Sequence, residues 1–377
     1  MNNKKLTFSK DGKFKIMQIA DVQESTTVSA DTIKLISLAV QEEKPDLVVF
    51  TGDQLYGLLP FFRIGNPYVN VKQTLSDIVS PLEFNNIPFA VTFGNHDCQT
   101  GVSNKEQADI YTSFEQYVGG NYRNEDDKGT YTIPIYSEDG NEILFNLYLI
   151  DSNGQSITGE YLPVSEEQIE WYKKERDALF EKTGRYIPSV VFQHIPVPEF
   201  FDVIKKVAKG TKGAVEAFRT HKNEFYTLPE EIIINGGFMY ESPAIPDKNS
   251  GEFEALKEKG DVLSIFVGHD HINSFSAKLD GIDLVYTQGT GFNVYGPGRN
   301  RGVRIIELDK NDLTKVSSRT VTFGSLTNDK ISAPVKEFVL THIPSSMEQV
   351  KRIAAWGVAA GISALTIGAV AYKKLKK

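Results

Sequence analysis

The stretch Val267-Gly268-His269-Asp270-His271 places two histidines on alternate positions, directly after an apolar run that begins at Val262. Side chains two positions apart at the end of a strand point the same way, so both imidazoles are expected to face one pocket. Neutral imidazoles are suitable ligands for divalent and trivalent metal ions. The spacing alone is a modest signal, and its weight depends on what the rest of the chain provides.

Four further polar clusters follow short apolar runs in the same way. They are Ile19-Ala20-Asp21-Val22-Gln23, Val49-Phe50-Thr51-Gly52-Asp53, Thr92-Phe93-Gly94-Asn95-His96-Asp97 and Val191-Phe192-Gln193-His194. Between the first two clusters, apolar residues at helical spacing and the stop Lys44-Pro45 predict a strand–helix–strand unit. Open α/β sheets hold ligands at the carboxyl ends of their strands, where these clusters fall.

The alternation of strands and helices in the first half, and hairpin signals such as Asp280-Gly281 in the second, predict an α/β fold of two sheets with helices outside. The long segment between Gly210 and Ser250 is expected to pass over the site and select the substrate. We expect a single domain over residues 1–323, a linker over 324–350, and a separate tail over 351–377.

Composition limits the class of partner. Six of the 41 basic residues and none of the 49 acidic residues lie from Lys351 onward, so residues 1–350 carry a formal charge of −14. A body this acidic repels nucleic acid over most of its surface, although bound metal ions can reverse the sign locally. The single cysteine, Cys98, excludes an internal disulfide and fits a reducing compartment.

The tail predicts a membrane anchor. Residues 353–372 form twenty positions without a charge, long enough as a helix to cross a hydrocarbon layer of roughly 30 Å. Trp356 and Tyr372 lie near its ends, and Gly357 with Gly361 provides small residues for a tail-mediated dimer. The alternative is an Ala- and Gly-rich helix packed on the body. Because no apolar run follows the first residues, we expect a tail anchor with the catalytic domain on the cytoplasmic face, although the terminal lysines mildly oppose this orientation.

The five clusters contain the parts of a two-metal hydrolytic site, which needs a bridging carboxylate, nitrogen and oxygen ligands, and an acid for the leaving group. Asp53 is the natural bridge because a carboxylate has two oxygens. One metal is then assigned to Asp21 and His271, and the other to Asn95, His194 and His269. This leaves His96 to protonate the departing oxygen, with Asp97 holding its ring.

In these motifs and their order the chain resembles the calcineurin-like metallophosphoesterases. The resemblance covers about residues 14–308, and Pro243-x-x-Pro246-x-x-Asn249-Ser250-Gly251 is similar to the branch near the purple acid phosphatases and related intracellular-type phosphatases. It implies a four-layer αββα sandwich and a dinuclear site of iron, zinc or manganese. It also implies attack on phosphorus by a metal-bound hydroxide.

One position departs from the family pattern. The first motif usually reads Asp-x-His, and here its third residue is Gln23, a weaker neutral ligand. Purple acid phosphatases lack that histidine as well and supply a tyrosine from Gly-Asp-x-x-Tyr, which Gly52-Asp53-Gln54-Leu55-Tyr56 matches. Either Tyr56 completes the first metal site, which favours Fe(III), or Tyr56 is a packing residue and the first metal is held loosely.

These observations predict a metal-dependent phosphomonoesterase acting on a phosphorylated small molecule, protein or lipid. The alternatives are a phosphodiesterase for a nucleotide or lipid headgroup, and a membrane-anchored binding protein whose catalysis is weakened through Gln23. Arg299 and Arg301, in a Gly- and Pro-rich segment, are candidates to grip a phosphate oxygen, and a solvated turn is the competing interpretation.

Overall fold

Two β-sheets form the centre of the protein in the computed structural model, which describes residues 5–58 and 60–342. The larger sheet has nine strands, with β5 (Asn121–Tyr122) paired to β6 outside the main order. Across this sheet the strands are β1 (Leu6–Thr7), β6 (Tyr131–Tyr136), β7 (Ile143–Leu149), β8 (Ser189–Phe192), β13 (Val262–Val267), β15 (Ile282–Tyr286), β14 (Asn273–Leu279) and β12 (Phe238–Met239).

The second sheet has five strands, and a small third sheet lies in the segment expected to pass over the site. Across the five-stranded sheet the order is β17 (Ser317–Thr322), β16 (Gly302–Asp309), β2 (Lys13–Ile19), β3 (Leu47–Thr51) and β4 (Phe89–Thr92). The small sheet consists of β10 (Val215–Glu216), β11 (Phe225–Thr227) and β9 (Lys205–Val207).

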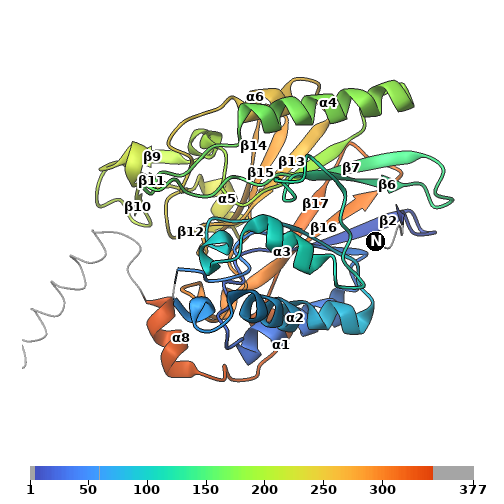
Figure 1. Cartoon of the computed structure of the whole chain (residues 1–377). Helices are drawn as coiled ribbons and strands as arrows, with labels where there is room; N and C mark the ends of the chain where they lie inside the picture. Colours follow the sequence, from blue (N-terminus) through green and yellow to red (C-terminus); the bar gives the residue numbers. More distant parts are fainter. Residues whose placement is uncertain (1–4, 59, 343–377) are drawn as a thin grey trace, which may run out of the picture.

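Helices cover the outer faces of the two large sheets (Figure 1). Below the five-stranded sheet lie α1 (Ala30–Glu43), α2 (Pro67–Asn85) and α3 (Asn104–Tyr111), and above the nine-stranded sheet lie α4 (Glu166–Thr183) and α6 (Glu252–Lys257). The shorter helices are α5 (Glu230–Ile234), α7 (Phe323–Leu326) and α8 (Pro334–Thr341). The expected mixed α/β fold with sheets inside and helices outside is confirmed.

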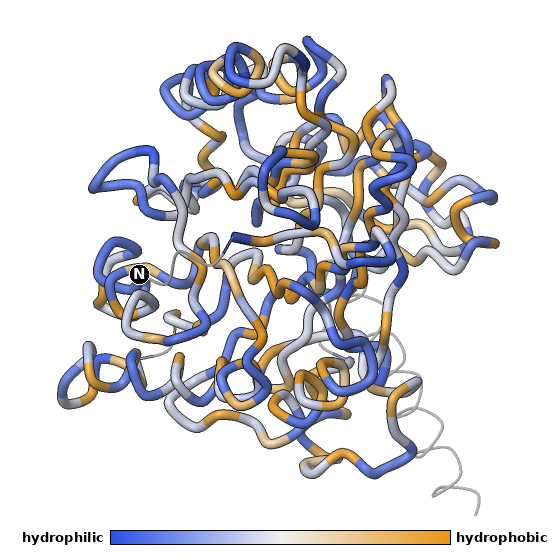
Figure 2. Tube along the Cα trace, turned by 90° about the vertical axis from the view of Figure 1, so that its right-hand side faces the viewer, coloured by the Kyte–Doolittle hydropathy of each residue, from blue (hydrophilic) through white to orange (hydrophobic). Residues whose placement is uncertain are grey.

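Three apolar layers hold these elements together, and Figure 2 shows hydrophobic segments gathered in the interior. One cluster joins the five-stranded sheet to α1 and α2, through residues such as Phe50, Ile36 and Leu75. Another joins the nine-stranded sheet to α4 and α6. The third fills the space between the sheets with buried side chains from both, including Val49 and Phe266. Each sheet is therefore buried on both faces, which explains the near-continuous apolar runs in its strands.

Local sequence signals fix the ends of several elements. At the start of α4, the Ser165 side chain accepts from the Gln168 backbone while the Gln168 side chain accepts from the Ser165 backbone, as the capping-box pattern predicts. Asp280 and Gly281 both have positive φ and join β14 to β15 as an antiparallel hairpin, also as predicted.

The helix that follows the Gly94-Asn95-His96-Asp97 cluster, α3, is short. It ends at Tyr111 because the following residues pair with the end of a strand instead: the Phe89 amide donates to Gln116 O (3.0 Å), and the Val118 amide donates to Phe89 O (2.7 Å). These bonds extend the edge of the five-stranded sheet.

The expected linker is packed in its first part. Residues 324–342 contain α8 and part of α7, and they contact the domain through Ser332, which donates to Asp31, and through Glu337, which pairs with Arg301. Within residues 5–58 and 60–342, no helix is long and apolar enough to cross a membrane. The predicted membrane helix over 353–372 lies outside the described residues.

Candidate metal centre and substrate cavity

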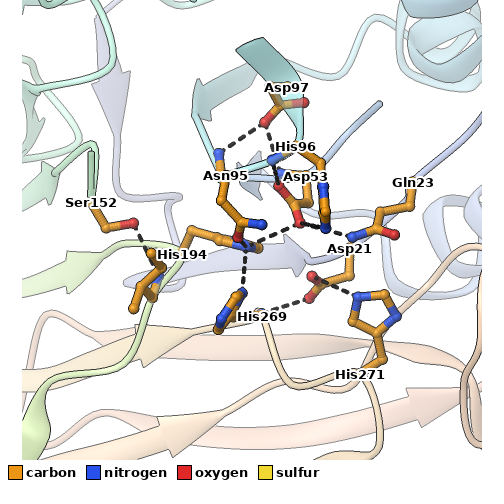
Figure 3. A network of polar contacts seen from close by, with 12 residues as sticks. Asp21, Gln23, Asp53, Asn95, His96, Asp97, Ser152, His194, His269 and His271 are labelled. Carbon is orange, nitrogen blue, oxygen red and sulfur yellow. Dashed lines mark hydrogen bonds and ion pairs between the residues drawn. The ribbon is translucent and has the colours of Figure 1, made fainter. Parts of the chain in front are cut away.

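Polar clusters from both sheets meet at one rim of the sandwich. In the five-stranded sheet β2, β3 and β4 run parallel, so Asp21, Asp53 and Asn95, which follow them, emerge at the same edge. In the other sheet β8 and β13 are parallel neighbours, and they deliver His194 and the two histidines of the Gly-His-Asp-His stretch. Figure 3 shows these side chains converging on one point. All seven candidate metal ligands other than Tyr56 are buried.

The turns after these strands have an uncommon backbone. Left-handed φ values occur at Asp21 (52°), Gln23 (38°), Asp53 (53°) and His269 (73°). Such conformations cost on the order of 1–3 kcal/mol each and persist at functional sites, where the surrounding structure enforces them. Gly94 permits the close approach, because a Cβ there would lie 2.2 Å from Asp53 Oδ1. The sequence predicted the ligands but not this strain.

Four side chains form one half of the centre, which we call the His194 half: Asp53, Asn95, His194 and His269. His194 Nδ1 lies 3.0 Å from the Thr51 carbonyl, which can only accept, so Nδ1 carries the hydrogen and Nε2 keeps its lone pair. That lone pair lies 3.2 Å from Asp53 Oδ2, 3.2 Å from Asn95 Oδ1 and 3.1 Å from His269 Nδ1.

These converging atoms need a positive charge between them. Although burial lowers the pKa of His194, the Asp53 carboxylate outweighs it and raises this pKa to about 10, so in the absence of a cation a proton takes its place on Nε2. The same contact lowers the pKa of Asp53 against the effect of its own burial. Burial and the neighbouring His194 keep the pKa of His269 well below its usual value, so its imidazole is neutral and suited to bind a metal. One ligand atom from each of Asp53, His194 and His269 lies within 4.8 Å of the others. The donor set therefore fits a cation.

The remaining predicted ligands form what we call the His271 half: Asp21, Gln23, Tyr56 and His271. His271 Nε2 lies 3.3 Å from Asp21 Oδ1, while its Nδ1 lies 3.0 Å from the Tyr295 carbonyl. Gln23 turns its amide nitrogen toward Asp53 Oδ2 (2.8 Å). Asp21 Oδ1 and Gln23 Oε1 are buried oxygens without a hydrogen-bond donor, which also fits a cation.

Tyr56 lies beside the centre, where its ring contacts His96, the predicted acid. Its ring packs edge-on against His96, with centroids 5.7 Å apart, and both side chains line the same cavity. The structure thus brings Tyr56 to the His271 half as a packing partner of His96. Its role as a metal ligand stays a prediction.

The predicted contact between Asp97 and the His96 ring is wrong. The Asp97 carboxylate accepts from three backbone amides, those of Asp53 (2.8 Å), Leu55 (3.0 Å) and Gly94 (2.8 Å), and so ties the Asp53 turn to the Asn95 turn. His96 Nδ1 instead contacts Gln99 Oε1 at 2.8 Å. Gln99 was missed by sequence reasoning, although its position three residues after His96 is the spacing of one helical turn.

The prediction that Arg299 and Arg301 grip phosphate is also wrong. Arg301 is fully buried and donates to the carbonyls of Gly291 and Val294 while pairing with Glu337. Arg299 donates to the carbonyls of Thr327 and Asp329. Both guanidinium groups hold chain segments together, because the backbone carbonyls that surround them are their nearest acceptors.

A cavity of about 660 Å³ opens from the centre. His269 and His271 lie in its wall, and so do Tyr161, Tyr295 and Glu241, which sequence reasoning missed. The segment after Gly210 supplies the opposite wall, as expected: Phe218, Arg219 and Lys222 precede β11 there. The Arg219 guanidinium is positioned by Asp247, at 2.7 and 2.6 Å.

Tyr161, Tyr295 and Glu241 hold the imidazole rings of the two histidines in this wall. Tyr161 packs edge-on against His269, with centroids 4.7 Å apart, and Tyr295 stacks on His271 at 4.2 Å. Glu241 accepts from the Tyr295 hydroxyl at 3.0 Å, and burial raises its pKa. No motif spacing connects these three residues to the histidines, so only the fold reveals them.

Comparison with known proteins agrees with this geometry. The family model of calcineurin-like phosphoesterases matches residues 14–273. The "Probable inactive purple acid phosphatase 29" of Arabidopsis thaliana is 28% identical, covering 83% of this chain and 81% of its own length. "Phosphatase DCR2" of Saccharomyces cerevisiae is 26% identical over 80% of this chain and 52% of its own. Among solved structures, a dimetal phosphatase from Danio rerio aligns with a TM-score of 0.46 at 13% identity, over 82% of this chain and 99% of its own. The chain therefore belongs to the calcineurin-like phosphoesterase family, and within it the chain is similar to the purple acid phosphatase-like branch.

Proposed function

We propose that the protein is a phosphomonoesterase that works with two bound cations. One observation carries the proposal: His194 Nε2 lies 3.2 Å from both Asp53 Oδ2 and Asn95 Oδ1, and 3.1 Å from His269 Nδ1. A positive charge between buried acceptors arranged in this way stabilises them. Iron, zinc and manganese all suit this mixture of imidazole, amide and carboxylate ligands.

Each half would hold one cation, with Asp53 between them. The His194 half offers two imidazoles, an amide oxygen and a carboxylate, and the His271 half offers Asp21, His271 and the amide of Gln23. When bound, such a pair of cations neutralises charge on the phosphoryl oxygens and lowers the pKa of a water molecule at the site. The left-handed turns keep the ligands of both halves in place before substrate arrives.

His96 is the proposed general acid. Its Nε2 lies 4.0 Å from Asp53 Oδ2, at the edge of the cavity, and its side chain is 21% exposed. With Gln99 Oε1 accepting from Nδ1–H, the other ring nitrogen is left to hold a proton for a leaving oxygen in the cavity that His96 lines. A proton held at Nε2 can then pass to that oxygen, which typically accelerates such reactions by about 10²–10⁴-fold.

The cavity supports an ester with a sizeable organic leaving group. It is lined by the rings of Tyr56, Tyr161, Phe218 and Tyr295 beyond the metal centre, with Lys222 on the same wall. Its volume of about 660 Å³ exceeds what a phosphoryl group fills. The same volume favours a second candidate, a phosphodiester with two organic arms. A third candidate is a binding protein with weakened catalysis, which Gln23 in place of the usual histidine supports.

One experiment separates these three candidates. The full chain is loaded with manganese, zinc or iron, its metal content is measured, and turnover of an aryl phosphate is compared with that of the aryl diester. We expect two cations per chain and faster hydrolysis of the monoester. Faster hydrolysis of the diester would establish the second candidate, and metal binding without turnover would establish the third. Full activity after complete metal removal would refute all three.

His96→Asn tests the proposed acid separately. Turnover should fall by about 10²-fold for an alkyl phosphate, whose leaving oxygen needs a proton, and far less for a nitrophenyl phosphate. His342→Asn is the matched control, because His342 is exposed and its ring stacks on Phe338 away from the centre. An equal loss with both substrates would contradict the role of acid.

We also propose that residues 353–372 anchor the enzyme in a membrane with the catalytic domain in the cytoplasm, where its substrates are phosphorylated small molecules, proteins or lipids. The support is the uncharged run itself and the basic residues after it. Flotation with liposomes of the full chain and of a chain ending at residue 350 tests this proposal. Equal recovery in the soluble fraction would contradict it.

A further inference from the structure

Arg304, in the middle of β16, is a buried arginine of an unusual kind, because it is only 4% exposed and its partners are neutral. Its Nε donates to Thr287 Oγ1 (3.0 Å), and its Nη1 donates to Ser318 Oγ (3.2 Å). Its Nη2 donates to Ser274 Oγ (3.2 Å) and to the Tyr286 carbonyl (2.7 Å). Four polar groups therefore position the guanidinium, and none of them balances its charge.

Other buried arginines of the described chain have acidic partners. Arg301 pairs with Glu337 at 3.2 Å, and Arg176 pairs with Asp177 and Glu258. For Arg304, burial lowers the pKa to about 10, and no carboxylate of the described residues acts against it. Charged side chains are almost never buried without a partner, because desolvation of an unpaired charge is costly. A counter-charge is missing at Arg304.

Arg304 also lines a second cavity, of about 780 Å³, distinct from the one at the metal centre. This cavity lies where β14 of the nine-stranded sheet faces β16 and β17 of the five-stranded sheet, and residues 229–237 around α5 complete its wall. Ser274 and Ser318 line it as well. Each serine oxygen accepts from Arg304, and within the described residues neither hydroxyl donates its own hydrogen to another group. Two free hydroxyl donors thus stand beside the unbalanced guanidinium.

The charges around the cavity indicate a small ligand. Lys278 and Arg319 also line it, but they pair with Asp283 (3.0 Å) and with Glu43 (2.6 Å). Asp202 and Glu231 are exposed acids of the same wall. These acids would repel a long polyanion that extends along the wall, whereas a small anion bound beside Arg304 would not contact them.

We propose that this second cavity binds a small tetrahedral oxyanion, phosphate or sulfate, on Arg304, Ser274 and Ser318. The guanidinium supplies the charge and the one Nη1 hydrogen that is not already donated, and the serine hydroxyls rotate to donate to the other oxygens of the anion. Bound there, the anion provides the counter-charge for Arg304 at the place where the edges of the two sheets meet.

Equilibrium dialysis of the full chain with radiolabelled sulfate, at an ionic strength held constant with chloride, tests this site. The double variant Ser274→Ala/Ser318→Ala removes two donors and keeps the arginine, so its binding should weaken at least about tenfold. Ser276→Ala is the matched control, because Ser276 lies on the same strand and lines the same cavity without contacting Arg304. It should bind sulfate as the unmodified chain does.

Arg304→Lys provides a second variant, since it keeps the charge but loses the planar donors that hold the two serine hydroxyls, and it should also weaken binding. Hydrolysis of an aryl phosphate checks that the metal centre is unchanged in the serine variants. Competition by inorganic phosphate alone would assign the site to the free ion, and equal competition by glycerol phosphate would assign it to a phosphorylated small molecule. Equal sulfate binding by the double variant and the unmodified chain, or no saturable sulfate binding, would overturn the proposal. In either case Arg304 would serve only to join the two sheets.

Discussion

The two halves of the candidate metal centre are built with different completeness. In the His194 half, His194 Nε2 lies within 3.1–3.2 Å of an atom of each of Asp53, Asn95 and His269, and the Thr51 carbonyl fixes the His194 ring. In the His271 half, Gln23 turns an amide nitrogen toward Asp53, and Tyr56 packs on His96. One cation would therefore have a complete set of ligands and the other a partial one. We therefore expect two unequal metal affinities, with the His194 half binding more tightly.

The largest effect is expected from removing the His194 imidazole, which lies in the middle of the half that should bind its cation more tightly. His194→Ala leaves Asp53 and Asn95 without the imidazole that separates them, and one of the two cations should be lost. Because a catalytic cation contributes several kcal/mol to the transition state, kcat/KM should fall by about 10³-fold or more. Metal analysis and turnover of an aryl phosphate measure the two effects. His342→Ala should change neither. Two tightly bound cations in His194→Ala would contradict the inference that the His194 half is the tighter one.

The next effect is expected from completing the weaker half. Gln23→His supplies the imidazole that the family pattern has at this position, and histidine tolerates the left-handed φ of 38° better than most residues. The weaker cation should bind about tenfold more tightly, as measured by competition with a chelator. The affinity of the His194 half should stay the same. An unchanged weaker site would mean that position 23 does not face its cation.

Strand ends explain why the sequence could place these side chains together. Each ligand follows a buried strand directly, and parallel strands of one sheet bring such residues to one edge without further information. Asp53, Asn95 and His194 could therefore be assigned together although they are far apart in the chain. A local turn signal at Asp280-Gly281 likewise located a hairpin of the nine-stranded sheet.

Contacts between distant loops were not predictable in this way. Asp97 was expected to hold the His96 ring, yet the backbone amides of two turns surround its carboxylate. Arg301 was expected at a phosphate, yet three-dimensional packing places it against Glu337 of a helix that the sequence suggested was linker. In each case the packing of the segments determines which partner the side chain contacts, and no pattern along the chain predicts it.

Glu337 should have a smaller effect, confined to the His271 half. It pairs with Arg301, which donates to the carbonyls of the loop that ends in Tyr295, and Tyr295 O contacts His271 Nδ1 at 3.0 Å. Glu337→Gln weakens this support, so the cation of the His271 half should bind about two- to fivefold more weakly, measured by chelator competition. Val335→Ala is the control, an exposed position on the same helix. A loss of affinity in the His194 half would contradict the separation of the two halves.

Tyr56→Phe should have the smallest effect, and it decides what completes the His271 half. The ring contact with His96, at 5.7 Å between centroids, survives without the hydroxyl, so the acid keeps its position. If the hydroxyl is not a ligand, both metal affinities should stay within about twofold, the range expected for surface changes that leave the packing intact. Metal titration of Tyr56→Phe beside Tyr56→Ala separates the ring from the hydroxyl. Loss of the weaker cation in both variants would identify the hydroxyl as a ligand, and the two halves would then be more alike than their geometry suggests. Loss of turnover in Tyr56→Ala alone would show that the ring positions His96.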